Sequence, residues 1–475
     1  MDIETFLSSG KSMVVAPAGY GKTYTIAEAI AAYKGDKKVL VLTHTHAGIA
    51  SLKEKFNQKG LLETAYHLDT ICSFALALTK TYHIRKEDIP SESEPNTMFR
   101  YAVEHARLIL RAKPIKKLLA SEYDHLIVDE YQDCTELQHQ MIMQIATTLK
   151  THILGDELQG IFGFRDPIVD FTEESLKPYL ENCQTLDTPW RWHNVGKDDL
   201  GRDIAAIRGK LLKNEDVDLR DYPSIEVLIA PESNYTQPRS EYKMKLYDVL
   251  RNESALLIHP KSESPAFRVN YVKQFPQLRM IESIDDKDLY EYCDRLDRLS
   301  SQNLVFAVVE MMRKLSKSTV IDIWFKKDNL LKAKQDVKDQ VISDTLMGVI
   351  EPLLKQKSYA NIVRLIENIQ KLPDLKVYRK ELLLDICKAL KDAERLGITA
   401  RQAVERNRNI LRQKGRKIKG RGIGTTLLTK GLEFDTVAVL NAHQFKSPKH
   451  LYVAISRCSR RLVVITQSYV LHPYQ

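Results

Sequence analysis

Apolar and polar positions alternate in blocks along the first half of the chain and predict an α/β fold. Short apolar segments of strand length occur at residues 13–16, 39–43, 126–129 and 152–155, with a weaker one at 184–187. Helical stretches separate these segments. Strands that alternate with helices pair in parallel, in a sheet that helices cover. The pattern therefore predicts a parallel sheet with helices on its faces.

The second half shows the same pattern, interrupted by a long helical block. A second α/β region begins near Thr188 and includes a possible strand at 255–259. Apolar residues then recur at helical spacing from about 286 to 421. Strand-like segments resume at 436–441 and 461–466. A strand-rich region that a helical block divides indicates one domain inserted into another.

These patterns predict an α/β protein with two parallel-sheet domains and small helical insertions. The first domain covers residues 1–187, with a helical insertion at about 75–122. The second covers 188–285 plus 422–475, and the helical insertion 286–421 ends in a basic segment.

Composition indicates a cytoplasmic protein without a membrane span. The chain has 475 residues, of which 43% are hydrophobic and 28% charged, and its apolar runs are well short of the roughly 18 residues that a membrane helix needs. The acidic start Met1-Asp2-Ile3-Glu4 lacks the basic and apolar regions of a signal peptide. Six scattered cysteines without metal-ligand spacing favour reduced thiols.

The formal net charge of +9 is concentrated near one segment. Between Arg401 and Arg421 nine basic residues face one acidic residue, Glu405. Lys414, Arg416 and Lys417 lie in this run, which is typical of a contact with a nucleic-acid backbone. A solvated, charged helix end is the alternative interpretation.

A phosphate-binding loop follows the first predicted strand and opens a helix. Backbone N–H groups at a helix N-terminus cradle phosphate, and two glycines let the backbone approach it. Lys22 can reach the β- and γ-phosphates, and the Thr23 hydroxyl can ligate Mg²⁺. The loop consists of Ala16, Pro17, Ala18, Gly19, Tyr20, Gly21, Lys22 and Thr23, and the first position is Ala16 where the generic pattern has glycine.

A pair of carboxylates ends the apolar segment 126–129 and predicts the hydrolytic chemistry. Nucleoside triphosphate hydrolysis needs one carboxylate to hold Mg²⁺ and another to orient and deprotonate the attacking water. Asp129 fits the first role and Glu130 the second. A surface acidic turn is the alternative, and the upstream phosphate loop argues against it.

The acidic segment Asp129-Glu130-Tyr131-Gln132-Asp133 resembles the Asp-Glu-x-Gln-Asp box of UvrD/Rep/PcrA-like superfamily 1 DNA helicases. Other segments resemble further motifs of that family, in its order: 41–47 the strand-plus-threonine motif, 70–74 the Thr-x-His-Ser-Phe element, 155–165 the Gly-Asp-x-x-Gln coupling motif with its trailing aromatic and arginine, Trp190-Arg191 the Tyr-Arg pair, 430–435 the Lys-Gly-Leu-Glu-Phe motif, and 451–457 the last motif. The order of the motifs makes the resemblance specific.

The resemblance implies two RecA-like domains that close over ATP and Mg²⁺, with single-stranded DNA lying across both. It implies that Trp190 stacks on the base and that Glu433 contacts the nucleotide, beside the loop residues Ala16 to Thr23. It implies catalytic roles for Glu130, Gln159, Arg191 and Arg457, metal binding by Thr23 and Asp129, and DNA contacts by Thr43, His44, Ser73, Phe74, Phe164 and Arg165. From the residues alone, Trp190 and Phe164 could equally belong to the core, and Arg165 to a surface ion pair.

The sequence departs from the family at several positions. No glutamine precedes Gln58, so the family's adenine-reading glutamine is absent or replaced, and we predict weak discrimination between ATP and GTP. His44 stands where the family often has a DNA-stacking phenylalanine, and Cys72 and Leu427 stand where it often has histidine. The departures at His44, Cys72 and Leu427 concern the DNA side, whereas the hydrolytic set is intact.

Three functions fit these features to different degrees. The first is a single-stranded DNA translocase or helicase moving 3′→5′, acting on single strands or tailed duplexes. The second is a nucleic-acid-sensing ATPase switch that regulates a partner. The third, a small-molecule kinase or ATPase, leaves Gln159, Arg457 and the basic segment unexplained. Because the chain ends soon after the last motif, we expect a separate nuclease or repair partner, as in two-protein antiphage defence systems such as Gabija.

Overall fold

The computed structural model describes residues 1–83, 85–90, 95–162, 167–171, 174–260, 266–281, 287–337, 339–414 and 420–474. The chain separates into two compact units, which are described one at a time. Unit 1 comprises Met1–Lys243, Arg412–Lys417 and Lys430–Gln475, and unit 2 comprises Met244–Leu411 and Ile418–Thr429.

A sheet of six parallel strands forms the first part of unit 1, with the order β3-β2-β4-β5-β1-β6. Its strands are β1 (Lys11–Val15), β2 (Lys38–Thr43), β3 (Tyr66–Thr70), β4 (Tyr123–Val128), β5 (Lys150–Gly155) and β6 (Cys183–Thr185). Its helices are α1 (Ile3–Ser8), α2 (Lys22–Ala32), α3 (His46–Gln58), α4 (Ile71–Tyr82), α5 (Pro95–Ile109), α6 (Lys113–Glu122), α7 (Glu136–Ile145) and α8 (Lys177–Leu180).

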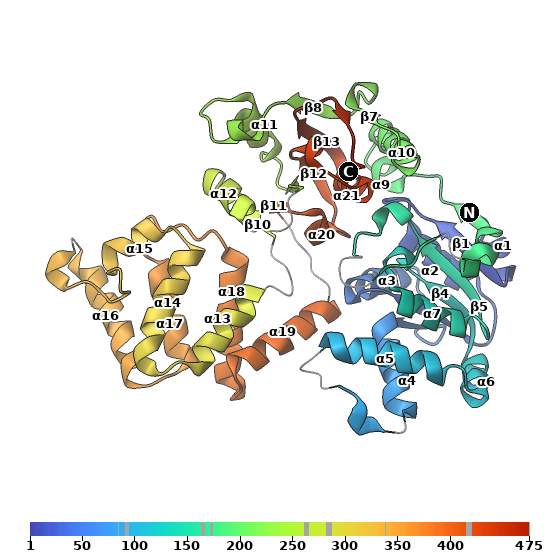
Figure 1. The fold of residues 1–475 in the computed structure, drawn as a ribbon, viewed down its shortest axis with the longest axis horizontal. Coiled ribbons are helices and arrows are strands. Elements are labelled where there is room, and N and C mark those ends of the chain that lie inside the picture. Colours follow the sequence, from blue (N-terminus) through green and yellow to red (C-terminus); the bar gives the residue numbers. More distant parts are fainter. Residues whose placement is uncertain are drawn as a thin grey trace. The chain divides into compact units, whose positions relative to one another are not determined.

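Both faces of this sheet are buried, which explains why its central strands are continuously apolar. On β2, Val39 and Val41 pack into one hydrophobic cluster, and Leu40 and Leu42 pack into another. All four side chains are fully buried, and each such burial stabilises the fold by about 1.5–3 kcal/mol. Figure 1 shows helices α2, α3 and α7 close to this sheet.

The rest of unit 1 adds a second set of parallel strands, β12 (Phe434–Val439), β13 (Cys458–Thr466) and β8 (Glu226–Ile229). The short strands β7 (Val217–Asp218) and β14 (Val470–Leu471) pair antiparallel. The helices here are α9 (Trp190–His193), α10 (Asp198–Leu212) and α21 (Pro448–Ile455), while α11 (Glu241–Val249) runs across the boundary of the unit.

Unit 2 contains three parallel strands and a helical bundle. The strands are β9 (Ala255–Ile258), β10 (Arg279–Met280) and β11 (Arg421–Gly424). The helices are α12 (Ala266–Gln274), α13 (Lys287–Arg298), α14 (Ser301–Leu315), α15 (Ser318–Trp324), α16 (Gln340–Lys355), α17 (Tyr359–Gln370), α18 (Lys380–Leu396) and α20 (Thr426–Thr429). Helix α19 (Ala400–Lys414) begins in unit 2 and runs across its boundary after Leu411.

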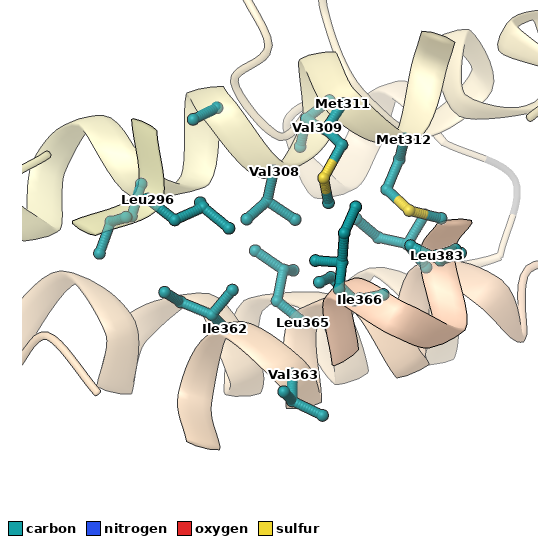
Figure 2. Packing of buried hydrophobic residues seen from close by; sticks show 14 of the residues in the cluster. Leu296, Val308, Val309, Met311, Met312, Ile362, Val363, Leu365, Ile366 and Leu383 are labelled. Carbon is teal, nitrogen blue, oxygen red and sulfur yellow. The ribbon is translucent and has the colours of Figure 1, made fainter. Parts of the chain in front are cut away.

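The bundle has a hydrophobic core of its own. Figure 2 shows Val308 of α14 and Leu365 of α17 pointing into the space between their helices, with Met312 and Leu383 nearby. Replacing one of these buried leucines by alanine would cost about 2–5 kcal/mol. The helices α13 to α19 of this bundle lie within the block that the sequence predicts to be helical at 286–421.

The predicted α/β class is confirmed, because the strands pair in parallel in both units. The strands predicted from apolar runs coincide with β1, β2, β4, β5, β6, β9, β12 and β13 within a few residues. The two compact units follow other boundaries than the three predicted segments, so that division of the domains stays a prediction. Within the described ranges, no helix is long and apolar enough to cross a membrane.

Candidate nucleotide site

The carboxyl ends of β1, β2, β4 and β5 carry most of the predicted site residues. Parallel strands end at the same edge of a sheet, where open α/β sheets bind their ligands. The phosphate loop follows β1, Thr43 ends β2, the two carboxylates follow β4, and the coupling motif follows β5. The fold therefore gathers at one edge segments that lie more than a hundred residues apart in sequence.

The phosphate loop has the backbone of an anion cradle. Gly19 (φ 82°) and Gly21 (φ 84°) adopt the left-handed conformation that glycine tolerates best. A side chain at Gly19 would also place its Cβ 2.8 Å from the Cβ of Arg191. Gly21 is the N-cap of α2 and provides no side-chain cap. The N–H groups at the start of α2 are therefore available to a phosphate.

Lys22, the first residue of α2, lies between the two predicted carboxylates. Its ammonium is 3.0 Å from Oδ1 of Asp129 and 2.5 Å from Oε1 of Glu130. Burial lowers the pKa of Lys22, but the two carboxylates outweigh it and raise the pKa above its usual value. Burial raises the pKa of Asp129. Burial also opposes ionisation of Glu130, yet Lys22 and Lys430 hold the pKa of Glu130 down at about 2.

Glu130 holds a strained backbone. Its φ of 54° is left-handed, a conformation that costs a residue other than glycine about 1–3 kcal/mol. The 3₁₀ turn η2 (Tyr131–Asp133) begins directly after it. Gln132 of that turn donates a hydrogen bond from its amide nitrogen to Oε2 of Glu130. The carboxylate of Glu130 lies against Lys22 of the phosphate loop.

The residues predicted to bind Mg²⁺ fit that ion in chemistry. Mg²⁺ prefers oxygen ligands and usually takes one or two carboxylates together with phosphate oxygens. Thr23 and Asp129 offer a hydroxyl and a carboxylate next to the phosphate loop. In the described part of the chain, no group of three or more His, Cys, Asp or Glu residues could hold a metal ion. A hydroxyl and one carboxylate are donors that suit Mg²⁺ bound together with a triphosphate.

A chain of hydrogen bonds joins Glu130 to the coupling motif. Oε1 of Gln132 accepts a hydrogen bond of 3.1 Å from the backbone N–H of Asp156. Oδ2 of Asp156 in turn accepts one of 3.1 Å from Nε2 of Gln159. A Cβ at Gly155 would lie 2.6 Å from Oε1 of Gln132, so a side chain there would displace this carboxamide. The predicted γ-phosphate sensor and the predicted base are thus two side chains apart.

Lys430 links the Lys-Gly-Leu-Glu-Phe segment to the same cluster. Its ammonium donates to both oxygens of Asp133 (2.6 and 2.5 Å) and to the carbonyl oxygen of Gln159 (2.5 Å). It also lies 4.6 Å from the centre of the Phe162 ring. Burial, partly offset by Lys430, raises the pKa of Asp133 to about 6. Because the pair is buried, its geometry is held far more firmly than that of an exposed ion pair.

Arg191 and Glu433 lie together beside the phosphate loop. The backbone N–H of Arg191 donates to the carbonyl of Gly19 (2.9 Å), and its Nε donates to Oε2 of Glu433 (2.8 Å). Its guanidinium also donates to the carbonyl of Ser456. Trp190 is 46% exposed and covers Gly21, so it is a surface side chain and not part of the core.

Arg457 is buried and its guanidinium is bonded within its own half of the unit. It donates to the carbonyls of Val453 (3.0 Å) and Leu432 (3.4 Å) and to the hydroxyl of Ser456 (2.8 Å). Burial, together with the neighbouring charge of Arg191, lowers the pKa of Arg457 to about 10. These contacts make Arg457 a residue that organises its own segment, and its role toward a γ-phosphate stays a prediction.

The predicted DNA-side residues are in more varied environments. Oγ1 of Thr43 and Nδ1 of His44 are buried and have no hydrogen-bond partner among the described residues. Burial and the charge of Lys430 lower the pKa of His44 to about 4, so its ring is neutral. Thr70 is the N-cap of α4, where its hydroxyl accepts the backbone N–H of Ser73 (3.0 Å) and donates to the Ser73 hydroxyl (2.8 Å). Phe74 is only 5% exposed. Phe74 is thus a core side chain here and presents no ring face at the surface.

The remaining predicted DNA contacts lie mostly outside the described residues. Phe164, Arg165, Arg416 and Lys417 lie outside the described residues, and so does the side chain of Lys414 at the end of α19. Other charges of the basic segment have intramolecular partners. Arg401 pairs with Asp294 and Glu405, Arg408 pairs with Asp385, and Arg421 donates to backbone carbonyls. Part of the charge that the sequence suggests for DNA therefore stabilises unit 2.

Several residues of the cluster received no role from the sequence. Gln132, Asp133, Lys430 and Tyr452 stand inside quoted motifs, so their position next to assigned residues was the available signal. Asp156 was likewise part of the coupling motif. The hydroxyl of Tyr452 accepts a hydrogen bond of 3.0 Å from the N–H of Ala18 in the phosphate loop.

Comparisons with known proteins agree with this geometry. Residues 2–165 match the family model described as an AAA domain. An ATP-dependent helicase/nuclease subunit of Lactococcus lactis subsp. cremoris (strain SK11) is 33% identical over 115 residues, 24% of this chain and 9% of that protein. The protein of the same description from L. lactis subsp. lactis (strain IL1403) is 30% identical over 131 residues, 27% of this chain and 10% of that protein.

Among solved structures, the arterivirus nonstructural protein 10 helicase in complex with DNA matches 54% of this chain and 48% of its own, at 12% identity and a TM-score of 0.25. The aligned segments span about a tenth of the length of the two Lactococcus proteins. The aligned N-terminal part contains the phosphate loop, the acidic box and the coupling motif up to residue 165. These motifs and matches make the N-terminal part of the chain similar to ATP-dependent helicases, and they support the resemblance to the UvrD/Rep/PcrA-like superfamily 1 helicases.

Proposed function

We propose that the protein is an ATP-dependent translocase or helicase on single-stranded DNA that moves 3′→5′. The observation that carries the proposal is the continuous bonded cluster from Lys22 through Glu130 and Gln132 to Gln159 and Lys430. It joins the residues that hydrolyse a triphosphate to the segment that couples hydrolysis to DNA in this family. The name of the Lactococcus relatives, which describes an ATP-dependent helicase/nuclease, supports the helicase part of the proposal.

In the proposed reaction, the phosphate loop binds the triphosphate and Glu130 takes the proton of the attacking water. A bound triphosphate offers Lys22 new oxygen partners, which frees the Glu130 carboxylate to face the water. Mg²⁺, held by Thr23 and Asp129, would neutralise phosphate charge. Arg191, which lies against Gly19, is placed to stabilise charge that develops during transfer.

Gln159 is the proposed link between the nucleotide and DNA. Its side chain contacts Asp156 and its backbone carbonyl contacts Lys430, so a shift at the γ-phosphate reaches two segments at once. Thr43 and His44 are proposed DNA contacts. Each has a buried polar atom without a hydrogen-bond partner in the described structure. Alternating closure and opening would then move the strand.

The first experiment is ATP hydrolysis with and without single-stranded DNA. Glu130→Gln should lower turnover by about 10²–10⁴-fold, because it removes the general base. Glu28→Gln is the matched control, since Glu28 is a glutamate on α2 that pairs with Lys59 away from the site. Strong stimulation by DNA that disappears in Glu130→Gln supports the proposal, whereas hydrolysis that DNA does not change contradicts it.

Direction is tested separately by displacement of streptavidin from biotinylated oligonucleotides. A 3′→5′ motor displaces streptavidin from the 5′ end faster than from the 3′ end. Faster displacement from the 3′ end would reverse the proposed direction and leave the rest of the proposal intact.

A nucleic-acid-sensing switch that regulates a partner nuclease is the second candidate. The departures at His44, Cys72 and Leu427 favour it, and Cys72 is already occupied as the acceptor of a hydrogen bond from Gln138. In this case DNA would change nucleotide binding without sustained movement. Processive unwinding of a 3′-tailed duplex by the isolated protein excludes the switch.

A further inference from the structure

Arg208 of α10 lies outside every motif quoted above, yet it reaches the coupling motif. Its Nη2 is 2.9 Å from Oδ1 of Asp156. The Asp156 side chain is fully buried, and that of Arg208 is only 15% exposed. A buried carboxylate needs such a partner, because an unpaired charge in the interior is strongly unfavourable.

Asp156 uses both of its oxygens to organise the coupling motif. Oδ1 accepts from the backbone N–H of Leu158 (3.3 Å) in addition to Arg208, and Oδ2 accepts from Nε2 of Gln159 (3.1 Å). The orientation of the Gln159 carboxamide therefore depends on the orientation of this carboxylate. Arg208, by binding the opposite oxygen, fixes that orientation.

The same guanidinium also supports the phosphate loop. It lies 6.0 Å from the centre of the Tyr452 ring, and the hydroxyl of Tyr452 accepts the N–H of Ala18. Nε of Arg208 is buried and has no hydrogen-bond partner among the described residues. Arg208 thus connects α10 to two walls of the nucleotide site, through Asp156 on one side and Tyr452 on the other.

We propose that Arg208 is a positioning residue for the hydrolytic reaction, which sets the orientation of Gln159 through Asp156 and so the response of the site to the γ-phosphate. The proposal rests on the proposed function of the nucleotide site. Arg208 touches neither nucleotide nor water in this proposal, and it acts only through Asp156. Removing it should therefore affect turnover more than nucleotide binding.

The test compares Arg208→Gln, Arg208→Lys and Asp156→Asn in the full chain. Arg208→Gln should lower kcat by about 10–100-fold, because misplacement of a catalytic group by about 1 Å has an effect of this size, while KM for ATP changes less than about threefold. Arg208→Lys keeps the charge without the planar fork and should recover only part of the loss. Arg202→Gln is the matched control, an exposed arginine on the same helix that pairs with Asp199.

Two further readouts separate positioning from a loss of structure. If Arg208 acts through Asp156, the double variant Arg208→Gln/Asp156→Asn should be no worse than the more affected single variant. The preference of the site for a non-hydrolysable ATP analogue over ADP, measured with fluorescent nucleotides, should fall in Arg208→Gln and stay at the wild-type value in Arg202→Gln. If Arg208→Gln does not fold, Arg208→Lys and Asp156→Asn carry the same comparison.

The outcomes are distinguishable from those of the proposed function. A kcat in Arg208→Gln that equals that of Arg202→Gln overturns the proposal, and so does a raised KM with unchanged kcat. Additive losses in the double variant also overturn it. If the wild-type protein shows no DNA stimulation, the proposed motor function fails, but the preference for the ATP analogue over ADP still decides the role of Arg208.

Discussion

The residues proposed for hydrolysis and those proposed for DNA contact lie mostly at the same edge of one sheet, but they differ in how many of their polar atoms are bonded. Lys22, Glu130, Asp133 and Lys430 are all bonded to one another or to their immediate neighbours. Thr43 and His44, at the end of the adjacent strand β2, have buried polar atoms that no described residue satisfies. A buried polar atom without a partner costs about 1–3 kcal/mol.

We interpret this difference as one between a group of residues that is already in position and a group whose polar atoms gain partners when a ligand binds. Paired charges hold catalytic groups in position before the substrate arrives, which reduces the reorganisation needed during reaction. Polar atoms without partners gain most when a ligand supplies them. The same division fits the sequence, which resembles the family's hydrolytic motifs more closely than its DNA-contacting position at His44. Triphosphate chemistry restricts the choice of residue type more than contact with a DNA strand does.

The largest expected effect breaks the preorganised side. Lys430→Met leaves Asp133 without its cation, and losing one partner of a buried ion pair costs about 3–5 kcal/mol in the free energy of unfolding. Urea unfolding followed by circular dichroism measures the loss. The double variant Lys430→Met/Asp133→Leu should recover most of it, because apolar side chains then replace both charges.

Arg401→Gln provides the contrast for this experiment. Arg401 pairs with Asp294 and Glu405 but is 39% exposed, and such pairs contribute about 0–1 kcal/mol. If Lys430→Met and Arg401→Gln lower the free energy of unfolding by the same amount, the buried cluster around Lys430 is no more firmly held than an exposed ion pair, and the comparison is wrong.

The next effect concerns two histidines beneath the hydrolytic residues. Nε2 of His152 and Nδ1 of His125 are 2.9 Å apart, and Ser12 bonds the other ring nitrogen of His152 at 2.7 Å. Burial lowers the pKa of His125 to about 4, and burial with the adjacent His125 lowers that of His152 to about 3. In the unfolded chain both pKa values are about 6.5.

The sign of the pH dependence follows from these values. Below about pH 6.5 the unfolded chain binds protons that the folded chain does not bind, so stability present above pH 6.5 is lost as the pH falls toward 4. Each histidine contributes a slope of up to about 1.4 kcal/mol per pH unit. His152→Gln should therefore reduce the slope of the unfolding free energy between pH 6 and pH 5 by about 1 kcal/mol per pH unit.

More of the fold than of the contacts inside the candidate site could be predicted from the sequence. The strands β1, β2, β4 and β5 were predictable because both faces of the sheet are buried, which makes their apolar runs continuous. β3 escaped prediction because polar His67 and Asp69 interrupt it. The phosphate loop and the acidic pair were predictable because phosphate chemistry restricts both spacing and residue type.

Contacts between distant segments carry no local signal. Lys430 reaches Asp133 and Arg208 reaches Asp156 only after the chain has folded, and nothing in the neighbouring sequence names either partner. The burial of Phe74 is a similar case, because the sequence of the motif does not indicate whether its aromatic side chain faces solvent or the core. The local charge count of the basic segment likewise carries no sign of Asp294 and Asp385, which pair with Arg401 and Arg408 in the folded chain.

A smaller effect sharpens the DNA side of the comparison. Neutralising Lys414, Arg416, Lys417 and Lys419 by glutamine should weaken binding to single-stranded DNA. The slope of log affinity against log salt should decrease by about 0.7 for each phosphate interaction that the substitutions remove. Arg401→Gln should leave this slope unchanged, because Asp294 and Glu405 already neutralise that arginine. An unchanged slope in the fourfold variant would return the segment to a solvated surface or a protein interface.

The smallest expected effect is the difference in kcat/KM between ATP and GTP. A site that reads a base by hydrogen bonds rejects the wrong base by about 10⁴–10⁵-fold, because its buried polar groups are otherwise left unpaired. The sequence has no glutamine before Gln58 for this purpose, and the exposed Trp190 beside Gly21 offers an aromatic face on which any base can stack. We therefore expect the kcat/KM values for ATP and GTP to differ by less than about 100-fold. Trp190→Ala should lower both by the same factor, since it removes stacking without removing a base-specific contact. A preference for ATP above that limit would mean that groups other than an upstream glutamine recognise adenine. The nucleotide site would then hold a further preorganised contact, and its difference from the proposed DNA contacts would be larger.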